Sequence, residues 1–368
     1  MYLAFSSPQQ VVEDLNAATA DDPQPVWMLC VADRHGEALP ELLDACRDQG
    51  IRVYGGLFPG LIHGAGVKYE GIVAIAFPAV SQLAIADLSE GRVAWREPLP
   101  DIPANGHASF HLLIDCLAPN ITGLMDDIYN RYGSRLVCYG AGAGYHDLRA
   151  LPSVFTEQGY LQDAAVMLVT PLQARVRVRH GWRRIAGPFV ASRTHDNVVQ
   201  ELNWEPAASF YRDLAAQQSA DFAASPVYPD ISAIYPLCIA KEGGEDVIRD
   251  AVSETDSGDI VFLSGVAENS VMYLAHGDED TLIAAACQAV DECSTPDAIR
   301  HCFISDCYSR ALNFGGNFHL ELEAVQDALR RFCDATPEGV LALGEVANNG
   351  GQYLELFNKT FVVALTHR

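Results

Sequence analysis

Short apolar runs rich in β-branched residues alternate along the chain with stretches in which apolar positions recur every three or four residues. The first pattern is typical of strands and the second of amphipathic helices. Helices are predicted over residues 8–18, 38–48, 121–132, 206–216, 279–291 and 320–334. Strands are predicted over residues 26–32, 51–55, 71–77, 82–88, 107–116, 136–140, 164–170, 174–180, 197–202, 233–240, 259–264, 271–275, 299–306, 340–344 and 361–366. This alternation predicts the α/β or α+β class, with mixed β-sheets covered by helices.

A weak internal repeat links three glycine-rich turns, each followed by an apolar strand. Residues 53–56 lead to the strand 71–77, residues 138–142 lead to 164–170, and Leu343-Gly344 lead to 360–366. Glycine suits such turns because it allows positive φ and close backbone approach. The chain of 368 residues also exceeds the ~250–300 at which single cores stop growing. We therefore expect two related, pseudo-symmetric domains, 1–195 and 196–368, joined through the polar stretch 191–203.

The composition favours a protein of the cytoplasm. The apolar run 71–80 is about half of the ~20 residues that a bilayer requires and contains Pro78, so no membrane insertion is expected. The first ten residues have neither the basic region nor the apolar run of a signal peptide. Ten cysteines without a CxxC pair indicate free thiols in a reducing compartment, with neither a disulfide nor a four-cysteine metal site.

The charge balance argues against nucleic acid as a partner. A formal charge of −24 repels phosphate backbones and anionic lipid. One basic stretch stands out, formed by Arg175, Arg177, Arg179, His180, Arg183, Arg184 and Arg193. It admits two interpretations: a solvated face that compensates nearby acids, or an anion site suited to the planar guanidinium fork.

Several segments together carry a resemblance to a known family. These are YGGLFPGLIHGAGVKYEGIVAIAF from residue 54, YGAGAGYHDLRALPSVFTEQGYLQDAAVMLV from 139, HGWRRIAGPFVASRTHDNVVQELNWEPAASFY from 180, Cys307-Tyr308-Ser309-Arg310, and LALGEVANNGGQYLELFNKTFVVAL from 341. They resemble the N-terminal and C-terminal domains of the FIST family over nearly the whole chain. The chain departs from that pattern where Ser309 replaces a glycine and where Tyr145-His146-Asp147 replaces plain acidic residues.

The resemblance implies an intracellular sensor of a small-molecule ligand that reports to a partner protein. One branch of the family, the NosP type, binds haem, senses nitric oxide and regulates histidine kinases or cyclic-di-GMP signalling enzymes. We therefore expect haem in or beside a cleft between the domains and a partner of this kind. A homodimer is compatible with this expectation, and no catalytic activity is expected.

A haem would need one imidazole as an iron ligand and cationic groups for its propionates. In order of preference, the candidate ligands are His195 in the inter-domain stretch, His180 at the end of the arginine strand, and His146 after the glycine turn. Arg175, Arg177 and Arg179 would face the propionates. Gly142 and Gly144 would let the backbone approach a ligand closely.

Two alternatives come from other residues. A FIST module could bind a different small molecule, such as an amino acid. A thiol-dependent enzyme could use Cys307, whose pKa the nearby Arg310 would depress, and both residues are candidate ligand contacts. His107 with His111, and His301 with Cys302, have spacings compatible with metal pairs but lack further ligands. Walker A, G-x-S-x-G and dinucleotide-binding motifs are absent.

Overall fold

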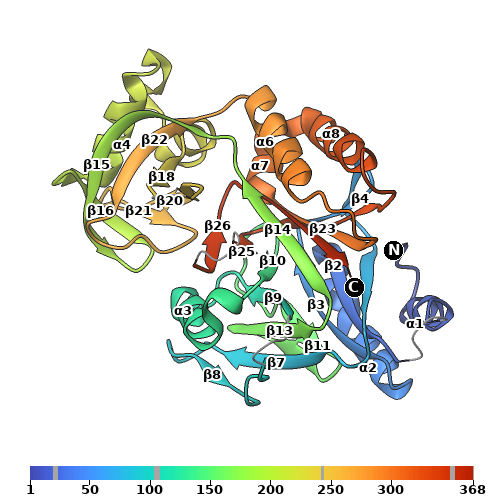
Figure 1. Ribbon diagram of the computed structural model, residues 1–368. Helices are drawn as coiled ribbons and strands as arrows, with labels where there is room; N and C mark the ends of the chain where they lie inside the picture. Colours follow the sequence, from blue (N-terminus) through green and yellow to red (C-terminus); the bar gives the residue numbers. More distant parts are fainter. Residues whose placement is uncertain (20–23, 103–107, 242–243, 349–352, 368) are drawn as a thin grey trace.

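Three mixed β-sheets and one antiparallel β-sheet make up the computed structural model, which describes residues 1–19, 24–102, 108–241, 244–348 and 353–367 (Figure 1). Sheet I has the order β1 (Tyr2–Leu3), β6 (Ile72–Phe77), β2 (Val26–Ala32), β3 (Arg52–Phe58), β11 (Val154–Thr156), β12 (Gly159–Leu161). Sheet II has the order β26 (Glu355–Phe357), β25 (Glu345–Ala347), β10 (Cys138–Ala143), β9 (Ser109–Asp115), β13 (Ala164–Thr170), β7 (Gln82–Asp87), β8 (Ala94–Trp95). Sheet III has the order β14 (Gln173–Arg179), β27 (Phe361–His367), β23 (Ile299–Cys307), β24 (Pro337–Ala342), β4 (Gly60–His63), β5 (Gly66–Lys68).

The first three sheets contain the same unit. In each, a strand, a helix and a second, parallel strand are followed by an antiparallel strand beside the first. The units are β2, α2 (Leu39–Asp48), β3 and β6; β9, α3 (Ile121–Tyr132), β10 and β13; and β23, α8 (Phe318–Arg330), β24 and β27. Within the described residues the repeat thus occurs three times.

A glycine occupies the same place in the second strand of each unit. Gly55 pairs with Leu29, Gly140 with Leu112 and Gly339 with Ile304. A Cβ on these glycines would lie 2.0, 1.8 and 1.8 Å from the carbonyl oxygen of the paired residue. The glycines therefore permit the close approach of the two parallel strands. The alignment of the repeats from the sequence placed the third glycine at Gly344, and this prediction is wrong. The residue equivalent to Gly55 and Gly140 is Gly339.

The units exchange strands in a cycle. The hairpin β4–β5 of the first unit pairs with β24, the hairpin β11–β12 of the second with β3, and the hairpin β25–β26 of the third with β10. Likewise β7 extends the sheet of the second unit and β14 that of the third. Both halves of the chain therefore contribute to the same sheets. The domain limits 1–195 and 196–368 stay a prediction.

The inner faces of the three sheets enclose one core that includes Met28, Tyr54, Leu113, Tyr139 and Phe303. The outer faces are covered by helices. Helices α1 (Pro8–Ala17) and α2 cover sheet I, α3 covers sheet II, and α6 (Glu279–Glu292) and α8 cover sheet III. Strands such as β2 are buried on both faces, which explains their continuous apolar sequence. The predicted α/β class with helix-covered mixed sheets is confirmed.

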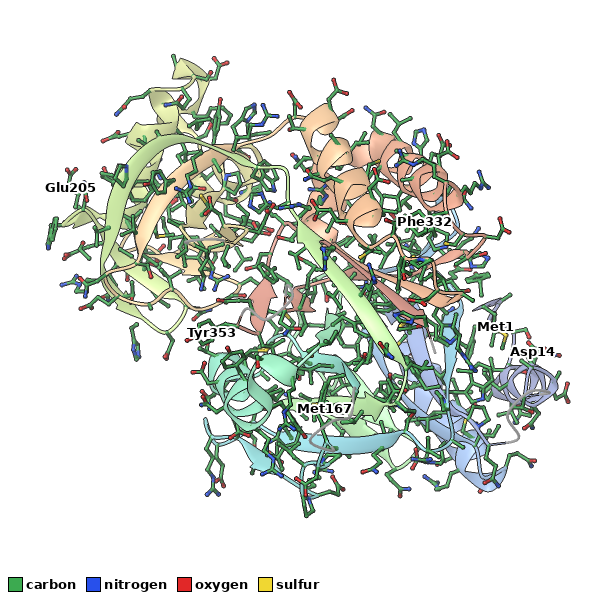
Figure 2. All side chains as sticks on the ribbon, viewed as in Figure 1. Met1, Asp14, Met167, Glu205, Phe332 and Tyr353 are labelled. Atoms are coloured by element: carbon green, nitrogen blue, oxygen red, sulfur yellow. The ribbon has the colours of Figure 1, made fainter. Side chains whose placement is uncertain are left out.

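The fourth sheet is inserted between β14 and α6. Its order is β19 (Val247–Arg249), β18 (Leu237–Ile239), β22 (Val271–His276), β15 (Arg183–His195), β16 (Val198–Leu202), β21 (Ile260–Phe262), β20 (Ala251–Glu254), with β17 (Glu205–Pro206) on β16. With α4 (Ala207–Ala216) it forms a core of its own around Phe189, Tyr211 and Phe262. We call residues 183–276 the inserted sheet. Figure 2 shows Glu205 at its outer end.

The structure also contains two short helices, α5 (Ser232–Ile234) and α7 (Tyr308–Phe314). Over the described part of the chain, no helix combines the length and apolar character needed to cross a membrane.

Candidate functional site

The carboxyl ends of β3, β10 and β24 meet at the centre of the three units. The Gly144 amide donates to the Leu57 carbonyl at 2.8 Å, and the Gly142 amide donates to the Gly344 carbonyl at 2.6 Å. Gly142 and Gly144 were predicted to let the backbone approach a ligand closely. Their amides instead contact the backbone of neighbouring segments of the protein. We call the side chains that follow these strands and β2, β9 and β23 the central face: Asp33, Cys116, His146, Cys307, Tyr308 and Glu345. Ligands of α/β sheets commonly bind at such carboxyl ends.

Asp33 and His146 form a hydrogen-bonded pair on the central face. Asp33 directly follows β2, and its side chain is 3% exposed. Its Oδ2 atom accepts from the His146 amide at 2.8 Å and from His146 Nδ1 at 2.7 Å. Because a carboxylate only accepts, Nδ1 carries the hydrogen, and in the neutral imidazole Nε2 keeps its lone pair. The His146 side chain is 53% exposed, so this lone pair is accessible.

Aromatic and cationic groups adjoin this pair. The guanidinium carbon of Arg149 lies 4.2 Å from the centre of the Tyr145 ring. Burial raises the pKa of Tyr308, and Tyr69 and Asp33 raise it further. The contacts around His146 are made by residues of the first and second units.

The repeat provides two counterparts of the Asp33 and His146 pair. Six residues after the glycine of the second strand stand His146, Glu345 and Leu61, in the second, third and first unit. Four residues after the first-strand residue that pairs with this glycine stand Asp33, Cys116 and Tyr308, in the first, second and third unit. The matching pairs are Cys116 with Glu345 and Tyr308 with Leu61. Cys116, Glu345 and Leu61 are all buried. Among these three junctions, only that of Asp33 and His146 presents a hydrogen-bonded polar pair with an accessible ring nitrogen.

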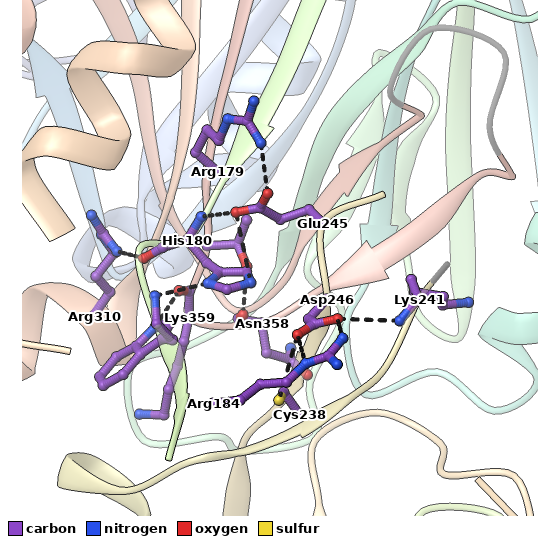
Figure 3. A network of polar contacts seen from close by, with 12 residues as sticks. Arg179, His180, Arg184, Cys238, Lys241, Glu245, Asp246, Arg310, Asn358 and Lys359 are labelled. Carbon is purple, nitrogen blue, oxygen red and sulfur yellow. Dashed lines mark hydrogen bonds and ion pairs between the residues drawn. The ribbon is translucent and has the colours of Figure 1, made fainter. Parts of the chain in front are cut away.

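His180 lies in a buried polar network between sheet III and the inserted sheet (Figure 3). The Trp182 amide donates to His180 Nδ1 at 2.8 Å, and Glu245 Oε1 lies 3.7 Å from Nε2. Burial lowers the pKa of this imidazole, while Glu245 opposes the shift. Since Nδ1 accepts a hydrogen bond, neutral His180 carries its proton on Nε2, facing the carboxylate. Neither ring nitrogen offers a free lone pair.

The predicted arginine strand is engaged in contacts with the protein itself. Arg175 donates to the Ser294 carbonyl at 2.9 Å, and Arg177 lies 3.8 Å from Glu292. Arg179 forms ion pairs with Glu245 at 2.7 Å and with Glu292 at 2.6 Å. These contacts agree with the interpretation in which the arginines compensate nearby acids.

His195 is the last residue of β15 in the inserted sheet, where it pairs with Val198 of β16. Its side chain is 84% exposed, and Nε2 lies 3.8 Å from Asp196, which is 86% exposed. Among the described residues, no hydrogen bond or ion pair joins His195, His180 and His146, and those of Arg175 and Arg177 reach none of these histidines.

Cys307 and Arg310 lie at the end of β23 and on α7, and both are buried. Cys307 Sγ lies 3.4 Å from Ser309 Oγ. The Arg310 guanidinium bonds to Glu321 and to the carbonyls of His180 and Leu282, so it holds elements together in the interior. Neither side chain is open to an external substrate.

The remaining predicted histidines are structural. His111 is buried among aromatic rings, and its Nδ1 lies 3.1 Å from the Tyr54 hydroxyl. His301 Nε2 lies 3.0 Å from the Ala76 carbonyl. His107 falls outside the described residues. Within the described ranges, no three His, Cys, Asp or Glu side chains gather in a way that could hold a metal ion.

Two surface cavities lie away from the central face. One of about 670 Å³ opens at the start of β23 and β24 and is lined by residues that include Arg300, His301 and Phe332. The other, of about 590 Å³, is lined by residues 95–99 and Arg131. Neither is lined by a predicted haem ligand or by Cys307, Arg310, Gly142 or Gly144.

The sequence analysis ranked His146 last and did not connect it with Asp33, which is 113 residues away along the chain. The available signal was that both residues follow the carboxyl end of a predicted strand. It also missed Glu345 and Asp306, two buried acids beside Cys307.

Comparisons with known proteins agree with the resemblance. The model of the FIST N domain matches residues 26–205, and the model of the FIST C domain matches residues 207–348. A search of curated proteins found no match. Since the two models together account for most of the sequence, the chain belongs to the FIST family.

Proposed function

We propose that this protein is a sensor whose small-molecule ligand binds at the central face through His146. FIST domains are sensory modules of signal transduction. The observation that carries the proposal is the hydrogen bond from His146 Nδ1 to Asp33, which leaves Nε2 accessible. A buried carboxylate that fixes the imidazole is the arrangement found behind histidines that ligate metals.

Haem is the ligand that we propose for this site, and His146 is the histidine that fits it. Of the three predicted ligands, His180 has both ring nitrogens directed at other groups, and His195 lies exposed on the inserted sheet. Bound haem would supply an iron atom able to bind a diatomic gas such as nitric oxide. Arg149, which stacks on Tyr145 and also lies 3.5 Å from Asp147, is the cation of this face that could meet an acidic group.

Asp33 has a definite role in this proposal. It holds the imidazole ring in one orientation and keeps the proton on Nδ1, so that Nε2 presents its lone pair outward. The Asp33 side chain is itself fixed by the His146 amide. The pair therefore binds and orients without needing to rearrange.

Haem titration of purified variants tests the proposal. We expect wild type and His195→Ala to develop a Soret band on addition of haem, and His146→Ala to lose most of it while staying folded. His195→Ala serves as the matched control because it removes an exposed imidazole. A normal Soret band in His146→Ala would contradict the assignment. If wild type binds no haem but is stabilised by an amino acid, the ligand class is different and His146→Ala should abolish that stabilisation.

The output is proposed to pass to a histidine kinase or a cyclic-di-GMP enzyme inside the cell. Kinase autophosphorylation measured with and without the haem-loaded, nitric-oxide-treated protein tests this step. No change in the activity of either enzyme class would contradict it. A homodimer stays a prediction that sedimentation can test.

A further inference from the structure

Four charged side chains are completely buried near one another in the third unit. They are Asp306 on β23, Arg310 on α7, Glu321 on α8 and Glu345 on β25, each 0% exposed. We call them the buried acid cluster. With three carboxyl groups and one guanidinium, full ionisation would leave two negative charges uncompensated in the protein interior. Burial strongly disfavours such charges.

Arg310 is committed mainly to Glu321. Its Nε and Nη2 atoms donate to the two oxygens of Glu321 at 3.2 and 2.5 Å. Its remaining donors reach the carbonyls of His180 and Leu282, both at 2.7 Å. Asp306 Oδ1 lies 3.5 Å from Nε, within ion-pair distance but without a hydrogen bond. The Arg310 guanidinium therefore forms two hydrogen bonds with Glu321, whereas its interaction with Asp306 is only a longer ion pair.

The other two carboxyl groups lack the partners that an ionised carboxylate requires. Within the described residues, both oxygens of Asp306 and Oε1 of Glu345 have no hydrogen-bond partner. Glu345 Oε2 accepts a single hydrogen bond, from the Thr360 amide at 3.2 Å. Buried carboxylates normally accept several hydrogen bonds, so these groups are built for their neutral, protonated forms.

Among the described residues, the elements packed around the cluster bring no further free positive charge. Cys307 lies on β23, and Cys116 and Asp115 lie at the end of β9; none of these side chains can carry a positive charge. Lys359, in the loop before β27, has its ammonium 3.1 Å from Asp250 and 3.2 Å from Ser309 Oγ. His180 contributes its carbonyl, and its ring faces Glu245. Burial, and then the neighbouring Glu321, raise the pKa of Asp306 well above its ordinary value, and burial and Cys307 do so for Glu345.

We propose that Asp306 and Glu345 each hold a proton in the folded chain at neutral pH, which makes the buried acid cluster a proton-linked switch. Loss of these protons would place two more negative charges beside Glu321, with Arg310 alone to compensate them. The repulsion acts on β23, α7, α8 and β25, the elements that carry Cys307 and Tyr308 to the central face. The folded state, and with it the central face, therefore weakens as the pH rises.

The sign of this effect follows from proton binding. An unfolded chain loses carboxyl protons near pH ~4, whereas the folded chain retains them to higher pH. Between these limits the folded state binds more protons, so its stability falls as the pH rises. Each retained proton lowers the folding equilibrium constant about tenfold per pH unit within that window.

Infrared spectroscopy of the wild-type protein tests the proposal without any substitution. We expect the absorption of protonated carboxyl groups in the folded protein at neutral pH and its disappearance on unfolding at the same pH. Absence of that absorption from the folded protein overturns the proposal.

Variants assign the protons to residues. Asp306→Asn and Glu345→Gln mimic the protonated forms, and each should remove about a tenfold change per pH unit from the pH dependence of the folding equilibrium. Asp327→Asn, which alters an acid that is 76% exposed, is the control and should leave the dependence as in wild type. If folded Asp306→Asn and Glu345→Gln keep both the wild-type pH dependence and the wild-type infrared absorption, the proposal is overturned.

Discussion

The Nδ1 atom of His146 lies 2.7 Å from Oδ2 of Asp33, across 113 residues of sequence and between two units of the repeat. Asp33 directly follows the first strand of one unit, and His146 follows the second strand of the next. The hairpin exchange between units brings them together, because β11 and β12 of the second unit lie on β3 of the first. The fold thus creates a junction that neither unit contains alone.

Substitution Asp33→Asn should weaken haem binding while leaving the fold intact. The amide cannot hold the imidazole as the carboxylate does, and loss of such a supporting group lowers metal affinity about 10- to 100-fold. The dissociation constant measured from the Soret absorption checks this. Asp126→Asn, at an exposed position of α3, should behave as wild type. Equal affinity in Asp33→Asn and wild type would argue against the role given to this carboxylate.

Substitution Gly140→Ala should destabilise the folded chain by about 1–3 kcal/mol or more, because an added methyl group forces the parallel strands apart. Its Cβ would lie 1.8 Å from the Leu112 carbonyl oxygen. The free energy of unfolding from urea titration measures the effect. Gly316→Ala is a suitable control because no described atom lies within 4 Å of its Cβ position. Equal losses in the two variants would show that strand spacing is not the reason for Gly140.

Substitution Lys359→Met should lower the free energy of unfolding by about 3–5 kcal/mol, because it leaves the buried Asp250 carboxylate unpaired. The ammonium of Lys359 is 3.1 Å from Asp250, and their side chains are 2% and 9% exposed. Combining Lys359→Met with Asp250→Asn removes the orphaned charge and should recover much of the loss. A double variant no more stable than Lys359→Met would contradict the importance of this ion pair between the inserted sheet and the loop before β27.

Acid should destabilise the chain through His111. Burial lowers the pKa of this imidazole from its usual 6.5 to about 3, so below pH 6.5 the unfolded chain binds a proton that the folded chain excludes. The contribution of His111 to stability therefore falls from pH 6.5 toward about 3, at about 1.4 kcal/mol per pH unit, and it opposes the contribution of the buried acid cluster. His111→Phe should lack this contribution, so the slope of stability against pH should differ from that of wild type by about this amount over the same range. An unchanged slope in a folded variant would contradict this assignment.

The sequence predicted those parts of the structure that depend on local pattern. The helix expected over residues 121–132 is α3 with the same limits, and the apolar runs at 26–32 and 164–170 are β2 and β13. In these segments the periodicity of buried positions is a property of the segment itself.

Features that depend on distant pairing were missed. The third repeat was aligned on Gly344 because it is followed by a glycine-rich turn, whereas the strand contact requires Gly339, which pairs with Ile304 of the distant β23. Glu345 was taken only as part of a family motif, and its burial beside Cys307 depends on how β25 packs against β23. His195 stood in a stretch interpreted as the passage between the domains, whereas it ends β15 and pairs with Val198 of β16 within the inserted sheet.

The most direct test of the account follows the individual histidines by nitrogen NMR during titration with ferric haem. The account predicts that Nε2 of His146 is shifted and broadened by the iron, whereas the signals of His180 and His195 change little. Iron-induced shifts at His180 or His195 with an unchanged His146 signal would contradict it.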